Sequence, residues 1–124
     1  MAVRVGINGF GRIGRLAMRA AMQVGRNDVE FVAINDLGPV RTNAHLLKYD
    51  SVHGKFPGSV TSDADSITVN GHQVKVLQEP DPKKLPWGDL GVDVVYECTG
   101  RFSDKDKAVA HLAAGAPRVL VSAP

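Results

Sequence analysis

The sequence predicts an α/β fold built on a mostly parallel, doubly wound sheet, with an antiparallel hairpin inserted into it. Three observations lead to this fold class. Short apolar runs, typical of strands buried on both faces, alternate along the chain with segments of helical period. A glycine-rich hexamer lies between the first apolar run and the first helical segment, and an Asn-Gly pair separates two alternating runs in the middle of the chain.

The first 36 residues read as one strand–helix–strand unit, whose two strands are expected to run parallel. The run from Val3 to Asn8 is short and apolar, as in a buried strand. From Arg12 to Val24 apolar residues recur at helical spacing, and Gly25 supplies a stop. A second strand is predicted over residues 29–34, directly before Asn35-Asp36.

The middle of the chain departs from this rhythm. Residues 42–49 predict a short helix, and the following loop over residues 50–58 contains glycine and proline. Two alternating runs then flank Asn70-Gly71, which is the strongest short-range signal of a hairpin. We therefore expect an antiparallel insertion at one edge of the fold. A turn-rich connection over residues 81–91, with about one helical turn, follows it.

The strand–helix–strand rhythm resumes towards the end of the chain. Residues 92–96 predict a buried strand that ends at Thr99-Gly100. A helix is expected from Ser103, with Asp106 as its capping-box partner and Gly115 at its end. A last apolar strand runs from residue 118 to residue 124. The predicted apolar stripe of the helix consists of Ala108, Val109, Leu112 and Ala113.

Composition sets broad limits on the function. The 124 residues suffice for one domain, and 44% apolar with 23% charged residues is ordinary for a globular protein. The net charge of +2 is too mild to indicate nucleic-acid or membrane binding. The single cysteine, Cys98, allows no internal disulfide and no cysteine-built zinc site. We expect a soluble, cytoplasmic protein without a bound metal.

The hexamer Gly9–Gly14 has the form G-x-G-x-x-G, and its position makes it informative. It follows a predicted strand, opens a predicted helix, and precedes an acid, Asp36, at the end of the next strand. Gly9 then permits the tight turn, Gly11 lets the backbone approach a pyrophosphate, and Gly14 lets helix and strand pack closely. The pattern therefore predicts a Rossmann-type site for a dinucleotide, with Asp36 on the adenosine ribose. A purely structural glycine turn with a chance acid is the alternative.

Longer stretches of the chain resemble one family. The segments VGINGFGRIGRLAMRA, AINDL, YDSVHGKF, PWGDLGVDVVYECTGRF and HLAAGAPRVLVSAP have the order and spacing found in glyceraldehyde-3-phosphate dehydrogenases, and the likeness covers essentially the whole chain. This resemblance implies NAD as cofactor and residues 1–124 as an NAD-binding domain ahead of a catalytic domain. It also implies a phosphorylated aldehyde as substrate and a homotetramer for the full-length protein.

The resemblance also assigns cofactor contacts to individual residues. The backbone at Arg12 and Ile13 would hold the pyrophosphate, beside Asn8, Gly9 and Gly11, and Asp36 would hold the adenosine ribose. Thr99, Gly100 and Phe102 would border the nucleotide, with Ser122 near the nicotinamide. One departure stands out, because Pro80 replaces the arginine that usually lies beside the adenine. That replacement puts affinity on the adenine side in doubt.

The chain holds no catalytic residues of the kind this family uses. The family's nucleophile is a cysteine in a Ser-Cys-Thr-Thr-Asn-type motif, which is absent here. Cys98 is expected to be a small core residue within its strand. The histidines are not expected to cluster, with His45 and His53 in surface or packing roles, His72 at the hairpin tip and His111 on a solvated helix face. Arg12, Arg15 and Arg19 are predicted to form another solvated face, with Arg12 near phosphate.

Three functions remain open at this point. The chain would be the cofactor half of a glyceraldehyde-3-phosphate dehydrogenase, or of a relative acting on another aldehyde such as erythrose 4-phosphate. The third possibility is a stand-alone nucleotide-binding module without catalysis.

Overall fold

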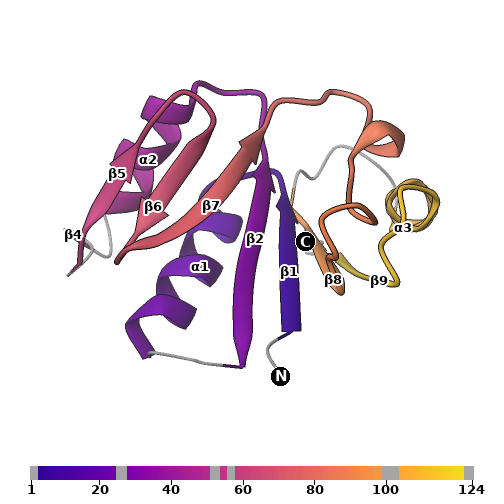
Figure 1. Cartoon of the computed structure of the whole chain (residues 1–124), viewed down its shortest axis with the longest axis horizontal. Coiled ribbons are helices and arrows are strands. Elements are labelled where there is room, and N and C mark those ends of the chain that lie inside the picture. The colour runs from indigo at the N-terminus through magenta and orange to yellow at the C-terminus, as the bar shows by residue number, and fades with distance from the viewer. Residues whose placement is uncertain (1–2, 25–27, 51–53, 56–57, 99–103, 122–124) are drawn as a thin grey trace.

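The computed structural model describes residues 3–24, 28–50, 54–55, 58–98 and 104–121. Its main sheet has seven strands in the order β5-β6-β7-β2-β1-β8-β9, and a separate two-stranded ribbon joins β3 to β4 (Figure 1). The elements in chain order are β1 Val3–Asn8, α1 Arg12–Val24, β2 Val29–Asn35, α2 Val40–Lys48, β3 Tyr49–Asp50, β4 Gly54–Lys55, β5 Val60–Ser62, β6 Ser66–Val69, β7 His72–Leu77, the 3₁₀ turn η1 Pro82–Lys84, β8 Val94–Glu97, α3 Asp104–Ala113 and β9 Arg118–Val121.

Five of these strands, β7-β2-β1-β8-β9, run parallel, which confirms the predicted doubly wound fold. From β1 the chain goes to β2 on one side of the sheet and later returns to β8 on the other. The boundary between β1 and β8 is therefore the point where the strand order reverses. In open α/β sheets, ligands bind outside the carboxyl ends of the strands at this kind of point.

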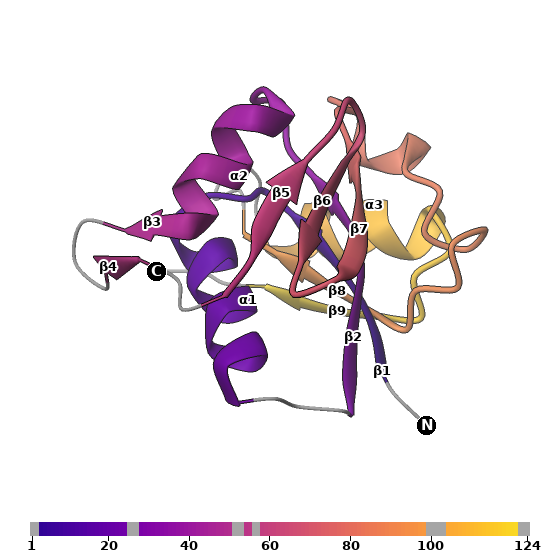
Figure 2. The same cartoon turned by 60° about the vertical axis from the view of Figure 1, so that its left-hand side comes forward.

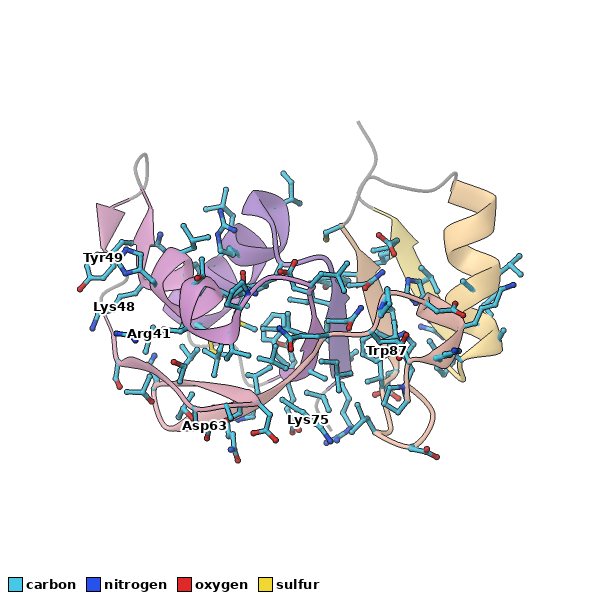
Figure 3. The ribbon with its side chains drawn as sticks, turned by 90° about the horizontal axis from the view of Figure 1, so that it is seen from above. Arg41, Lys48, Tyr49, Asp63, Lys75 and Trp87 are labelled. Carbon is cyan, nitrogen blue, oxygen red and sulfur yellow. The ribbon has the colours of Figure 1, made fainter. Side chains whose placement is uncertain are left out.

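Helices cover the sheet in two layers with separate cores. Figure 3 shows α1 and α2 along one side of the sheet and the segment that carries Trp87 along the other. On the first side Ile7, Met18 and Phe31 belong to one buried cluster. On the second side Trp87 and Val95 belong to another, against which α3 packs through its contacts with η1 and β9. Figure 2 shows α2 to the left of β5, β6 and β7 and α3 towards the right, partly behind β7.

The hairpin prediction is confirmed at Asn70-Gly71, where both residues have positive φ, and β6 pairs antiparallel with β7. Both strands of the hairpin are nevertheless part of the main sheet, because β7 also pairs parallel with β2. A further edge strand, β5, was not predicted. It is joined to β6 by a turn in which the Asp65 N–H and the Ser66 hydroxyl donate to Asp63 and lower the pKa of that carboxyl.

Helix boundaries agree with expectation at α1 and α3 and shift at α2. The second helix begins at Val40, two residues earlier than predicted, and Tyr49 lies in β3. The apolar stripe predicted for α3 is wrong, because Val109 and Leu112 are 54% and 50% exposed and Ala113 is also exposed. The side of α3 that packs inward carries Ala110 and His111 instead. The side chain of Ala108 and the cap at Ser103 lie outside the described residues.

The arginine face of α1 is only partly as predicted. Arg19 is buried at 3% exposure, contrary to the solvated position expected for it. Arg15 is half-buried and donates through Nη1 to the Phe10 carbonyl at 3.0 Å. Arg15 and Arg19 thus lie partly beneath the surface of the helix layer, and the aliphatic part of each side chain contributes to the packing. The side chain of Arg12 lies outside the described residues.

None of the helices among the described residues is long and apolar enough to cross a membrane. No group of three or more histidine, cysteine, aspartate or glutamate residues within the described ranges could hold a metal ion.

Gly6, in the middle of β1, is required by the packing of the second layer. A Cβ at this position would lie 2.5 Å from Cζ3 and 2.9 Å from Cε3 of the Trp87 ring. The indole therefore lies directly on the β1 backbone, in space that any other residue would fill. Trp87 itself is 0% exposed.

Replacing Gly6 with alanine is expected to lower the free energy of unfolding by about 1–3 kcal/mol, because the new methyl group overlaps the indole ring. Denaturant unfolding measures this change. The same replacement in a Trp87→Leu background serves as the control and should cost less. An equal loss in the two backgrounds would contradict the contact.

Candidate cofactor site

The glycine-rich turn lies between β1 and α1, as predicted. Gly9 adopts φ +91°, which favours glycine, and its N–H donates to the Asn35 carbonyl at 2.8 Å. A Cβ on Gly14 would lie 2.8 Å from the Gly9 carbonyl oxygen and 3.2 Å from Ile7 Cγ2. Gly9 thus makes the turn, and Gly14 lets α1 approach it. The fold itself requires both glycines.

Gly11 differs from its neighbours. It lies at the start of α1, where its carbonyl accepts the Arg15 N–H at 2.9 Å. A Cβ built on Gly11 meets no atom within 4 Å, so the space beside it is open. Neither packing nor a positive φ among the described residues calls for a glycine here. This open space, at the N-terminus of a 13-residue helix, fits the close approach of a pyrophosphate.

Asp36 joins the glycine turn to the end of β2. Its Oδ1 accepts the Phe10 N–H at 2.9 Å, and its Oδ2 accepts the Gly38 N–H at 2.9 Å. The amide Nδ2 of Asn43, on α2, donates to the same Oδ2 at 3.0 Å. Asn43 is buried, and Asp36 is half-buried. An ionised carboxylate has about four acceptor positions, so Asp36 keeps capacity for a ligand hydroxyl.

Three polar side chains form a row across the carboxyl ends of the central strands, which we call the carboxyl-end row. Its members are Asn8 on β1, Asn35 on β2 and Glu97 on β8, and the strand register pairs Asn8 with each of the other two. Asn8 Nδ2 donates to Glu97 Oε1 at 2.5 Å, and Asn35 Nδ2 donates to Asn8 Oδ1 at 2.8 Å. All three are buried, at 4%, 4% and 0% exposure.

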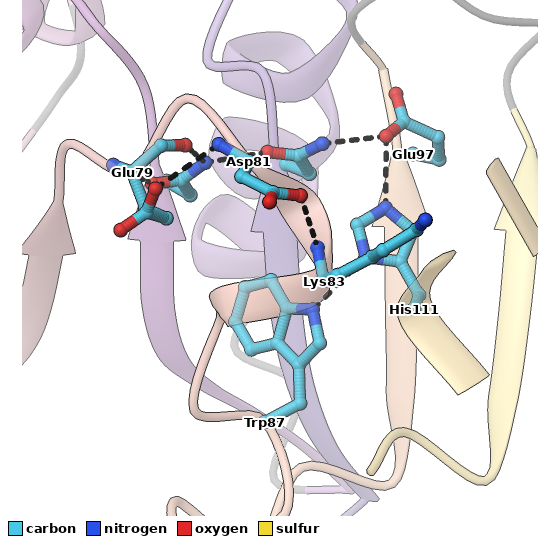
Figure 4. A network of polar contacts seen from close by, with 8 residues as sticks. Glu79, Asp81, Lys83, Trp87, Glu97 and His111 are labelled. Atoms are coloured by element: carbon cyan, nitrogen blue, oxygen red, sulfur yellow. Dashed lines mark hydrogen bonds and ion pairs between the residues drawn. The ribbon is translucent and has the colours of Figure 1, made fainter. Parts of the chain in front are cut away.

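The row continues in both directions (Figure 4). On one side Asn35 holds the backbone of Glu79, donating to its carbonyl at 2.9 Å and accepting its N–H at 2.8 Å. On the other side His111 Nε2 lies 2.8 Å from Glu97 Oε1, and Trp87 Nε1 donates to His111 Nδ1 at 3.0 Å. The prediction that His111 is solvated is wrong, because this side chain is 0% exposed.

The tautomer of His111 follows from its two partners. The indole N–H of Trp87 can only donate, so His111 Nδ1 must accept and carries no proton. The ring proton is then on Nε2 and is donated to Glu97 Oε1. His111 is therefore neutral. Sequence reasoning missed this network because its members are far apart in the chain, and no local period reports their pairing.

Several other predicted positions can be placed. Ile13 is 56% exposed in the first turn of α1, and Pro80 is exposed directly after Glu79. Cys98 follows β8 rather than lying inside it, is half-buried, and donates its N–H to the Asn8 carbonyl at 2.8 Å. Thr99, Gly100, Phe102 and Ser122 lie outside the described residues, so their predicted contacts stay predictions.

The described histidines lie apart, as the sequence suggested. His45 is exposed on α2 and packs against Tyr49 with ring centroids 4.9 Å apart. His72 begins β7 beside the hairpin turn, and its Nε2 lies 2.9 Å from the Phe31 carbonyl oxygen. His53 lies outside the described residues.

Comparison with known proteins identifies the family. The sequence model of one protein family, described as the glyceraldehyde 3-phosphate dehydrogenase NAD-binding domain, matches residues 3–105 of this chain. Dehydrogenases of this name from Cupriavidus necator (the chromosomal form) and Xanthobacter flavus are 58% and 60% identical over all of this chain, which covers 37% of each. That of Thermotoga maritima is 58% identical over 98% of the chain, which covers 36% of it. The chain thus belongs to the glyceraldehyde-3-phosphate dehydrogenase family and corresponds to its NAD-binding domain, with NAD as the cofactor.

Proposed function

We propose that this chain is the cofactor-binding part of a cytoplasmic, homotetrameric glycolytic enzyme. That enzyme would oxidise glyceraldehyde 3-phosphate, with NAD as hydride acceptor and phosphate as second substrate, to 1,3-bisphosphoglycerate. The open space beside Gly11 supports cofactor binding at this edge, because the fold does not otherwise require a glycine at this position. The names of the similar proteins support the choice of substrate.

The residues that would hold the cofactor surround the point where the strand order reverses. Unpaired N–H groups of the first turn of α1, at Arg12 and Ile13, would bind the pyrophosphate above Gly9 and Gly11. Asn8 directly precedes Gly9 in the chain and would support this turn. Towards the other end of the crevice, Thr99, Gly100 and Phe102 would border the nucleotide, with Ser122 near the nicotinamide.

The adenosine end would lie beside β2. Asp36 would accept a ribose hydroxyl there, and the segment that contains Pro80 would border the adenine. The carboxylate of Asp36 is fixed by Phe10, Gly38 and Asn43, so it is oriented before the cofactor arrives. Proline offers no N–H and no cationic side chain, so contacts on the adenine side are expected to be weak.

Selectivity for NAD over NADP is expected from the charge of Asp36. The 2′-phosphate of NADP would meet this carboxylate, at a cost of about 1–4 kcal/mol for unit charges 4 Å apart near a protein surface. Arg41 is exposed on α2, and none of the hydrogen bonds that described side chains and backbone make to Asp36 comes from a cation. We therefore predict at least tenfold tighter binding of NAD, or about 1.4 kcal/mol.

Calorimetric titration of both cofactors into the wild type and Asp36→Ala measures this preference. The variant should lose NAD affinity and bring the two affinities closer together. Asp89→Ala, at an exposed position outside the site, is the matched control and should change neither affinity. Equal affinity for the two cofactors in the wild type would count against the role of Asp36.

Gly11→Ala tests the open space at the N-terminus of α1. The added methyl group meets no protein atom, so the stability should fall by no more than about 1 kcal/mol, the typical effect of a changed N-cap. The NAD affinity should fall at least tenfold, because the methyl group occupies the path of the pyrophosphate. Unfolding and calorimetry on the same sample separate the two effects. Unchanged affinity would show that the pyrophosphate lies elsewhere.

The substrate itself is not specified by these residues, and erythrose 4-phosphate remains an alternative aldehyde. A stand-alone nucleotide-binding module is the other alternative. The 124 residues contain no Ser-Cys-Thr-Thr-Asn-type nucleophile motif. We propose accordingly that the 124-residue chain has no dehydrogenase activity of its own. An assay with glyceraldehyde 3-phosphate, NAD and phosphate should give background only. Turnover that disappears in Cys98→Ser would disprove this.

A further inference from the structure

The buried carboxylate of Glu97 is the acceptor for two donors that come from opposite directions. Asn8 Nδ2 reaches Glu97 Oε1 from β1 at 2.5 Å, and His111 Nε2 reaches the same oxygen from α3 at 2.8 Å. Glu97 is 0% exposed. A buried carboxylate without such donors would be strongly destabilising, so these bonds are a condition for its ionised form.

This acceptor determines the orientation of every polar group in the carboxyl-end row. Because Glu97 Oε1 accepts, Asn8 must present its NH₂ to it and its Oδ1 to Asn35. Asn35 must then present its own NH₂ to Asn8, which leaves Asn35 Oδ1 to accept the Glu79 N–H. The direction of the hydrogen bond at Glu97 thus determines the direction of each following hydrogen bond, as far as the backbone of Glu79.

Two residues of this path border the proposed cofactor site. Asn8 is the residue before the Gly9 turn, and Glu79 is the residue before Pro80, on the proposed adenine side. A change in the orientation of the two amides would therefore shift the pyrophosphate turn and the adenine-side segment together. None of the residues in the row needs to touch the cofactor for this effect.

We propose that Glu97 is a positioning residue for cofactor binding, which acts through the hydrogen-bond direction that it imposes on Asn8, Asn35 and the backbone of Glu79. The proposal rests on the proposed location of the cofactor at this edge. It also assigns to His111 the task of holding Glu97 from the α3 side, as a neutral Nε2–H donor.

Asn8→Asp is the first test, because it changes one donor into an acceptor at nearly constant shape. The introduced carboxylate faces Glu97, and two carboxylates in one site hold a shared proton to unusually high pH. While that proton is present it supplies the missing donor. The NAD affinity of the variant should therefore be at least tenfold below that of the wild type at about pH 8 and recover towards it at about pH 6, whereas the wild type should show no such change.

The charged groups on the elements around Asn8 matter for this pH profile. In the part of the chain that the structure describes, those towards the carboxyl ends of the strands are Glu97 on β8, His111 on α3, Asp36 after β2, and Glu79, Asp81, Lys83 and Lys84 before and within η1. Arg4 on β1 and Glu30 on β2 form an ion pair at 2.7 Å near the other ends of these strands, and α1 carries Arg15 and Arg19. The wild-type profile, measured in parallel, removes their own contribution from the comparison.

Two control variants separate positioning from stability. Glu97→Gln keeps an oxygen that can accept from both Asn8 and His111, so its loss of affinity should be smaller and the same at each pH. Ile67→Val, in the buried core of β6, lowers the melting temperature away from the row and should leave the NAD affinity unchanged. Affinity losses that simply follow the loss of melting temperature across all three variants would overturn the proposal.

Combining Asn8→Asp with Glu97→Gln exchanges the amide and the carboxylate and restores the wild-type charge. Only one carboxylate then remains at this contact, so no proton is shared between two carboxylates and the pH dependence of NAD binding should disappear. A pH dependence that persists in the double variant would show that it does not arise at this contact, and would overturn the proposal.

Nitrogen NMR of the His111 ring in the wild type gives a readout that needs neither a variant nor the cofactor. We expect the neutral Nε2–H form at about pH 6 to about pH 8. A charged ring or an Nδ1–H form would overturn the proposed hydrogen-bond direction. A wild-type chain that binds no NAD would instead count against the proposed function, while the His111 spectrum would still decide the direction of the row.

Discussion

The burial of the Glu97 carboxylate is the constraint on which much of the second layer depends. A carboxyl group at 0% exposure must be hydrogen-bonded, and His111 supplies one of its donors from α3. That bond fixes which face of α3 points inward, and His111 in turn accepts the Trp87 indole N–H. The indole then lies against β1 where only Gly6 leaves room. A single buried carboxyl group thus couples a helix, a loop and a central strand.

The parts of the fold that the sequence predicted are those with local signals. The change from an apolar run to a helical period marked β1 and α1, and Asn70-Gly71 marked the hairpin. At the site, the spacing of Gly9, Gly14 and the acid after β2 was enough to place the turn. Each of these signals lies within a short segment, where backbone geometry alone restricts the residues that can occur.

The parts that could not be predicted depend on partners far away in the sequence. Val109 and Leu112 fit an apolar helical stripe, yet the polar partners of His111 place them on the outside. The helical periodicity predicted a solvated position for Arg19, but its side chain is buried. The pairing of β7 with β2 likewise joins segments about 40 residues apart. Periodicity describes which residues share a face, and tertiary contacts decide which face is buried.

The four glycines near the N-terminus separate the demands of the fold from those of the ligand. Gly6 makes room for Trp87, Gly9 adopts a positive φ, and Gly14 lets α1 pack against the turn. Packing or backbone conformation accounts for each of these three. Gly11 alone faces open space, at the N-terminus of α1. A glycine that the fold does not need, in the position where the backbone would meet a pyrophosphate, indicates a requirement that comes from the cofactor.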